Sequence, residues 1–415
     1  MEPFVRQAAM TRQSAIAAPS LALARLAPGV AESIKGTLTR PKSLFALTLM
    51  LGTTIPFVVV ALQHILPGFV VVSVQEVIFF LGGIHVPLTA YLFFDPKIRT
   101  FMRHRPVALI VGPILIFAIC FFVFLSSWQS RAAGEAWPVV YFMLGVLAWN
   151  NWHFGKQNVG VYSFFRLSQS QPGVVSLERK LIVCGAVLGA VGIFAANDGG
   201  YLTNFINTYA KNDSFSLLRS VADNVSSFAR IGQYALLAFV VGYLAVNWRR
   251  YTWKTATMFF MCANFFFPIY VAMDMPVLTA VFACSMLSHG VQYCVFLGFH
   301  AGHYREDSNE RGVPDPKGRT GSIVMCVVLV VLAAFIGENF LYNKFIPKDF
   351  FSTVVTQAAG RGDVLTPVAE SFMIGILLTH FWLDSFFWRF KSPEPRQWMS
   401  KRYAFLINPG GGKRT

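Results

Sequence analysis

Residues 107–127 read VALIVGPILIFAICFFVFLSS, a continuous apolar run without a charged side chain. A helix that crosses the hydrocarbon core of a bilayer needs about 20 such residues. Backbone polar groups in lipid must be bonded within their own segment, and the period-two alternation of a strand is absent. The stretch therefore predicts a membrane-spanning α-helix.

Runs of the same kind recur along the chain and predict an all-α, polytopic integral membrane bundle. The ten predicted spans lie near residues 44–63, 68–94, 107–127, 137–161, 180–197, 232–248, 255–273, 276–300, 321–342 and 366–388. They form one transmembrane domain over residues 44–390. A basic N-terminal tail, residues 1–43, is expected to be retained in the cytosol, and a basic C-terminal tail covers residues 391–415.

The composition agrees with this fold class. Of the 415 residues, 55% are hydrophobic and only 13% are charged, with a mean hydropathy of +0.52. Soluble domains contain about 25% charged residues, so a soluble enzyme, a disordered chain and a coiled coil are excluded. The six cysteines all lie in apolar runs and form no CxxC pair, as expected for buried small hydrophobes rather than a zinc or disulfide framework.

The net charge of +15 is explained by topology rather than by a nucleic-acid partner. With ten spans and an internal N-terminus, 28 of the 35 Lys and Arg residues fall on the cytoplasmic side. Such an excess follows the positive-inside rule. We therefore expect both termini in the cytoplasm. The expected location of the protein is a bacterial inner membrane.

Histidines are the most informative polar residues of the chain. His64 and His104 are predicted to be an interface residue and a cytosolic-loop residue. The remaining six fall in spans 2, 4, 8 and 10, and they are His85, His153, His289, His300, His303 and His380. Counted from the cytoplasmic ends of their spans, His85, His153 and His380 differ in depth by only ~6 Å. Histidine is costly to bury in lipid, so a shared level indicates a shared site in the bundle interior.

Helical spacing adds supporting groups to these histidines. Asp384 follows His380 by one turn, so its carboxylate is predicted either to be a ligand or to orient that imidazole. Gln157 has the same spacing from His153, within the polar run NNWHFGKQN at residues 150–158. His300 and His303 share a helix face with His289 and Tyr293, so they could replace a ligand or build a second metal site.

Imidazole and carboxylate donors without a thiolate suit iron, zinc, copper or manganese. A b-type haem held by two histidines on facing helices also fits this donor set. The remaining alternative is that the histidines only hydrogen-bond between helices and bind nothing. The sequence favours a metal site to which His85, His153, His289 and His380 contribute, and the donor set alone is compatible with each of these metals.

Four short motifs carry a resemblance to a known family. They are Gly83-Ile84-His85, Trp152-His153-Phe154-Gly155, Ser288-His289-Gly290 and Thr379-His380. In these pieces the chain resembles the bacterial membrane β-carotene 15,15′-dioxygenases of the bacteriorhodopsin-related protein family. The resemblance implies non-haem iron held by four histidines and the oxidative cleavage of a lipophilic polyene.

These observations favour a membrane oxygenase that uses dioxygen on a lipophilic substrate. Besides the lipid bilayer, its expected partners include an electron-donor protein. Asp384, Tyr293 and Gln157 are the expected catalytic or supporting residues. A transporter or channel that passes protons or metal ions through buried His, Asp and Glu is the alternative function. A third reading is a hydrolase or acyl transferase with His289 as its base, for which the sequence identifies no nucleophile.

Overall fold

The computed structural model describes residues 40–65, 85–86, 88–94, 96–131, 137–193, 216–272, 278–302, 324, 365–388 and 393–407. Every regular element within these residues is a helix. Three of the described helices are long and apolar enough to cross a membrane, namely Pro41–Ile65, Val107–Ser127 and Ser227–Val246. For the described residues, the expected all-helical fold with helices able to span a membrane is confirmed, with three such helices.

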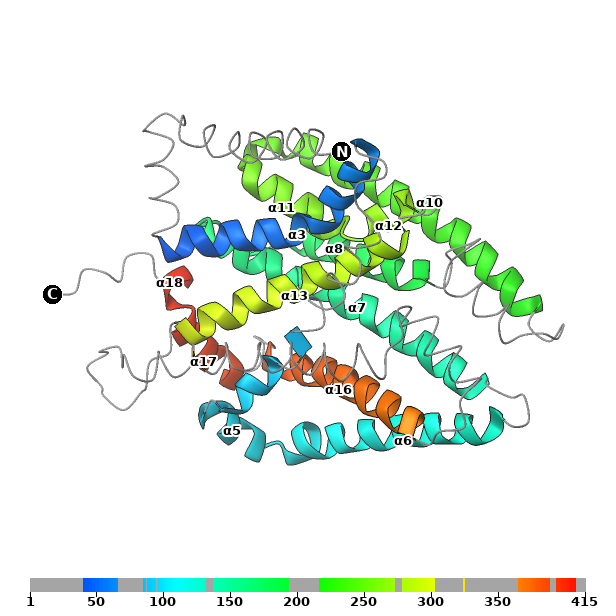
Figure 1. Cartoon of the computed structure of the whole chain (residues 1–415). Coiled ribbons are helices and arrows are strands. Elements are labelled where there is room, and N and C mark those ends of the chain that lie inside the picture. Colours follow the sequence, from blue (N-terminus) through cyan, green and yellow to red (C-terminus); the bar gives the residue numbers. More distant parts are fainter. Residues whose placement is uncertain are drawn as a thin grey trace, which may run out of the picture.

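The main helices lie side by side in pairs (Figure 1). They are α3 (Pro41–Ile65), α6 (Gly112–Arg131), α7 (Trp137–Ser168), α8 (Ser176–Ile193), α10 (Ser216–Val246), α11 (Trp253–Ala263), α13 (Leu278–Gly302) and α16 (Leu365–Phe387). α3 packs along α13, α6 along α16, and α7 along α8. Because α7 also contacts α3, α11, α13 and α16, it lies at the centre of the described bundle.

Close helix approaches depend on small residues. A Cβ on Gly155 of α7 would collide with Ala186 of α8, and one on Gly52 of α3 would lie 2.9 Å from Val291 Cγ1 of α13. At the second crossing Ser288 donates a 2.5 Å hydrogen bond to the carbonyl of Gly52. Small residues and interhelical hydrogen bonds are the usual means of association where the hydrophobic effect cannot act.

The region predicted as one span over residues 255–273 is broken. α11 ends at Ala263, a turn covers 264–266, and the short helix α12 occupies Phe267–Val271. Pro268 lacks the N–H that a continuous helix needs at this point. Both the backbone N–H and the side-chain amide of Asn264 donate to the carbonyl of Phe260, so Asn264 caps the end of α11. Hydropathy alone could not detect this break, because both halves are apolar.

Two other predicted boundaries also move. α10 begins at Ser216 rather than near residue 232. The prediction followed apolar residues only, and the first half of this helix is polar. In the second predicted span the described residues 85–86 are helical, and the 3-10 turn η1 follows at Thr89–Phe94. The predicted span at 321–342 lies outside the described residues except for Val324, and so does most of the predicted N-terminal tail.

The predicted C-terminal tail is folded where it is described. Helices α17 (Pro393–Arg402) and α18 (Ala404–Ile407) follow α16, and Met399, Tyr403 and Leu406 are buried. The Tyr403 hydroxyl donates a 2.8 Å hydrogen bond to the carbonyl of Phe296 on α13. The apolar residues of this basic segment pack against the buried core.

A buried ionic cluster joins α7, α8 and the extended residue Tyr251, which precedes α11. Glu178 is fully buried and accepts hydrogen bonds from Arg166 Nη1 at 2.7 and 2.8 Å and from Tyr251 Oη at 2.5 Å. Burial raises the pKa of Tyr251, and its hydrogen bond to Glu178 acts in the same direction. The cluster thus connects the end of α7, the start of α8 and the segment before α11.

Candidate metal centre

Four histidines from four separate segments converge at the middle of the bundle. His85 lies in the helical stretch before η1, His153 in α7, His289 in α13 and His380 in α16. The side chains of His85, His289 and His380 are almost completely buried, and that of His153 is 13% exposed. The tertiary structure thus joins residues that are widely separated in the sequence.

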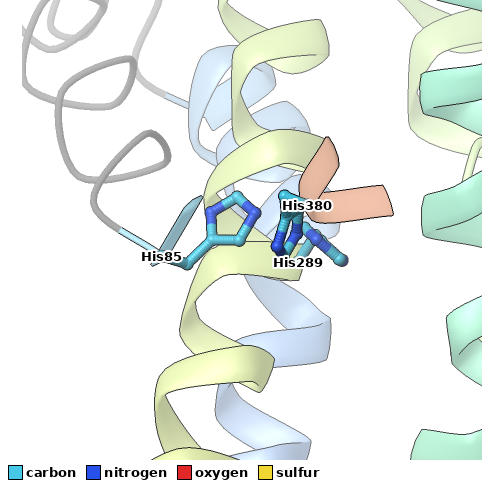
Figure 2. A group of neighbouring side chains, drawn as sticks. All are labelled: His85, His289 and His380. Atoms are coloured by element: carbon cyan, nitrogen blue, oxygen red, sulfur yellow. The ribbon is translucent and has the colours of Figure 1, made fainter. Parts of the chain in front are cut away.

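The imidazole rings are close enough to share a ligand. Figure 2 shows His85, His289 and His380 directed toward one another from different segments. Their ring centroids lie 4.5 Å apart for His85 and His289, and 4.9 Å apart for His85 and His380. One nitrogen from each of the three lies within 4.8 Å of the others. The ring of His153 lies 5.0 Å from His289 and 5.7 Å from His380.

Asp384 completes a second group of potential ligands with His153 and His380. Its Oδ2 lies 3.7 Å from His153 Nε2 and 3.6 Å from His380 Nε2. Both separations are too long for hydrogen bonds. Two ligand atoms that are each about 2.1 Å from one tetrahedral ion lie roughly 3.4 Å apart, close to what is observed. These separations are compatible with atoms that bind the same metal ion, and they are longer than those of hydrogen-bonded partners.

The other oxygen of Asp384 belongs to a chain of hydrogen bonds. Tyr293 Oη donates to Asp384 Oδ1 at 3.1 Å and lies 2.9 Å from Thr89 Oγ1. Thr89 Oγ1 in turn lies 2.5 Å from His380 Nδ1. Thr89, and not Asp384, is thus the group that contacts the second ring nitrogen of His380.

Phenylalanines pack against two of the imidazoles. Phe154, the neighbour of His153, stacks on His289 with centroids 4.4 Å apart, and Phe381, the neighbour of His380, stacks on His153 at 4.4 Å. Each of these phenylalanines directly follows one histidine and holds another in place. The Phe in His-Phe-Gly is thereby explained by packing across the site.

Several polar atoms at this point are buried without a hydrogen-bond partner within the described part of the chain. They are His153 Nε2, both ring nitrogens of His289, His380 Nε2 and Asp384 Oδ2. Buried polar atoms normally have a hydrogen-bond partner, so this group of unpartnered atoms needs an explanation. A divalent metal ion would accept one donor atom from each of these four residues, and nitrogen with carboxylate donors suits the non-haem transition metals.

The structure places His300 away from this group of residues. His300 lies near the other end of α13, with its ring 6.0 Å from Tyr91 and 6.3 Å from Tyr403. His64 and His104 are exposed, and Gln157 is half-buried. His303 lies outside the described residues. The predicted set of metal ligands is therefore brought together for His85, His153, His289 and His380 but not for His300.

Sequence reasoning missed several residues that support the centre. Besides Thr89 and the two phenylalanines, Gln292 donates from Nε2 to Thr53 Oγ1 at 2.9 Å and to Asn158 Oδ1 at 3.2 Å. This contact ties α13 to α3 and α7 next to His289. Gln292 was detectable as a buried amide three residues after His289, whereas Thr89 has no distinguishing signal in the sequence.

The chain was compared with protein-family models, curated proteins and solved structures. No family model, no curated protein and no solved structure matches the chain.

Proposed function

We propose that this chain is an integral-membrane metalloenzyme, a non-haem iron oxygenase that acts on a lipophilic substrate with dioxygen. The observation that carries the proposal is the convergence of four histidines and Asp384 in two buried groups of potential ligands that share His380. Among the described residues, side-chain atoms of His153, His289, His380 and Asp384 have no hydrogen-bond partner there. The resemblance of the His-containing motifs to the bacterial membrane β-carotene dioxygenases supports iron as the metal and a polyene as the substrate class.

In this proposal His85, His153, His289 and His380 hold the ion by one ring nitrogen each, and Asp384 contributes Oδ2. A bound non-haem iron would supply the activation of dioxygen. The protein's own part is to exclude bulk water and to hold the donors rigidly. Phe154 and Phe381 do both, because they cover two imidazole faces with apolar surface.

The proposal includes the full membrane topology, with ten spans and both termini in the cytoplasm. The three described helices that meet the length and apolarity of a span support it, as does the distribution of Lys and Arg. Reporter fusions at Gly200 and Gly360 should read extracytoplasmic, and a fusion at Pro314 should read cytoplasmic. A cytoplasmic reading at Gly200 would contradict this topology.

The decisive test is the metal content of the full-length protein purified in detergent. Wild type should retain one or two transition-metal ions, chiefly iron, and His153→Ala and His380→Ala should each lose most of it. His64→Ala and His104→Ala are matched controls, because both side chains are exposed and lie outside the cluster. Equal metal content in all four variants, or a metal-free wild type, would contradict the proposal and favour a proton or ion pathway.

Activity should depend on the same residues. Iron-loaded wild type should consume dioxygen in the presence of β-carotene as a polyene probe, and His153→Ala should not. If iron is bound but β-carotene stimulates no oxygen uptake, then the metal site stands and the polyene assignment fails.

A further inference from the structure

Thr89 bridges two polar side chains of the histidine cluster. It is buried, with 3% of its surface exposed, and its hydroxyl oxygen touches both His380 Nδ1 and Tyr293 Oη. Tyr293 continues the contact to Asp384 Oδ1. Because Asp384 and His380 lie one turn apart on α16, these four side chains close a ring through two other segments of the bundle.

The direction of each hydrogen bond in this ring follows from counting protons. Tyr293 donates its single hydroxyl proton to Asp384 Oδ1. Tyr293 has no second proton, so its contact with Thr89 requires Thr89 to donate. Thr89 has then used its only proton, and its contact with His380 requires the Nδ1–H of His380 to donate.

We infer that Thr89 is a positioning residue that, together with Tyr293, fixes His380 in the Nδ1–H tautomer and keeps Nε2 as the lone pair for a metal ion. The inference rests on the proposed metal centre. In this arrangement the two oxygens of Asp384 have different roles. Oδ1 accepts at the end of the hydrogen-bond chain, while Oδ2 lies 3.6 Å from the same Nε2.

Two substitutions break the chain at different points and have different consequences. Thr89→Val keeps the shape but leaves the Nδ1–H of His380 without its acceptor. Tyr293→Phe removes the acceptor of the Thr89 hydroxyl, which can then donate to Nδ1 and so favour the Nε2–H tautomer. That tautomer places a proton on the nitrogen that must bind metal. Thr89→Ser retains the hydroxyl and should behave as wild type.

The experiment measures the His380 ring by NMR on isotope-labelled, full-length protein in detergent, first metal-free and then with Zn²⁺ as a diamagnetic probe. The His380 signals are assigned by their loss in His380→Gln. We expect the Nδ1–H tautomer in wild type and in Thr89→Ser, altered ring-nitrogen signals in Thr89→Val, and a shift toward Nε2–H in Tyr293→Phe. Thr48→Val is the matched control, because the Thr48 hydroxyl bonds only to carbonyls of its own helix among the described contacts.

Zn²⁺ affinity provides the second measurement, by competition with a chelator of known affinity. Loss of an outer contact of a metal ligand typically weakens binding ~10–100-fold, and we expect this for Thr89→Val and Tyr293→Phe but not for Thr89→Ser. An Nε2–H tautomer in wild type, or His380 signals unchanged by Thr89→Val and Tyr293→Phe, would overturn the inference.

The two proposals fail in distinguishable ways. If wild type binds neither iron nor Zn²⁺, the proposed metalloenzyme is wrong, and the tautomer in the metal-free sample still decides the role of Thr89. If metal binds but Thr89→Val has wild-type signals and affinity, the metal centre stands and the positioning role is wrong.

Discussion

The ring of Phe154 lies on the imidazole of His289, with centroids 4.4 Å apart and planes inclined by 28°. Phe154 belongs to α7 and His289 to α13. A side chain of one helix therefore holds the imidazole of another helix in place. The same relationship holds between Phe381 of α16 and His153 of α7. The histidine cluster is therefore held in place by contacts between different helices.

Replacing Phe154 or Phe381 with Leu should loosen the stacked imidazole without removing a ligand. We expect a metal affinity about 10-fold lower, at the lower end of the range for outer contacts of metal ligands. Competition titration with Zn²⁺ measures it. Phe117→Leu, on α6 and packed against Phe372, is the matched control and should bind Zn²⁺ as wild type does. Wild-type affinity in both stacking variants would show that the rings only fill space.

Asp384→Asn should behave as the loss of a ligand, because Asp384 Oδ2 lies among the Nε2 atoms of His153 and His380 and not beside Nδ1. We expect the metal content to fall as far as in His380→Ala. The measurement is elemental analysis together with oxygen uptake, for both variants side by side. Wild-type values in Asp384→Asn would leave a purely histidine site.

His300→Ala should keep the metal content of wild type. From His289 to His300 the helix rises about 16 Å, which places the His300 ring beside Tyr91 and Tyr403 rather than in the cluster. Loss of a buried ring should instead lower the thermal midpoint. His289→Ala is the comparison and should lose metal. A metal loss in His300→Ala equal to that in His289→Ala would indicate a second, coupled site.

Arg166→Met should destabilise the protein strongly, because it leaves Glu178 fully buried without its cationic partner. Breaking a buried pair from one side typically costs about 3–5 kcal/mol. Adding Glu178→Leu to Arg166→Met should recover part of the loss. Unfolding in denaturant measures both effects. Arg249→Met, at an exposed position, serves as the control and should change stability by less than about 0.5 kcal/mol.

Alkaline pH should destabilise the protein through Tyr251, whose pKa is raised by burial and by its hydrogen bond to Glu178. The neutral phenol is favoured in the folded state, whereas the unfolded tyrosine ionises near pH ~10. The stability contributed by Tyr251 is therefore present below about pH 10 and is lost progressively above it. Tyr251→Phe should be less stable at neutral pH but should lose less stability at alkaline pH. Parallel pH profiles of the unfolding midpoint would contradict this role.

The sequence by itself determined the class of fold and the main ligand candidates. Uninterrupted apolar runs such as residues 107–127 must be helical in lipid, and histidines are too costly in such helices to be there without a purpose. The helical period also placed Asp384 beside His380, because that relationship is local to one helix. Each of these inferences needed only the chemistry and spacing of neighbouring residues.

Only the tertiary structure decided which groups meet. Pro268 and the turn at Asn264 broke a helix that apolarity alone made continuous, and α17 and α18 packed onto the core despite their charge. Thr89 reaches His380, and Phe154 covers His289, through helix crossings whose angles and registers no local pattern encodes. Contacts between segments depend on how whole helix surfaces fit together, so the orientation of the ligands could be seen only once the helices were packed.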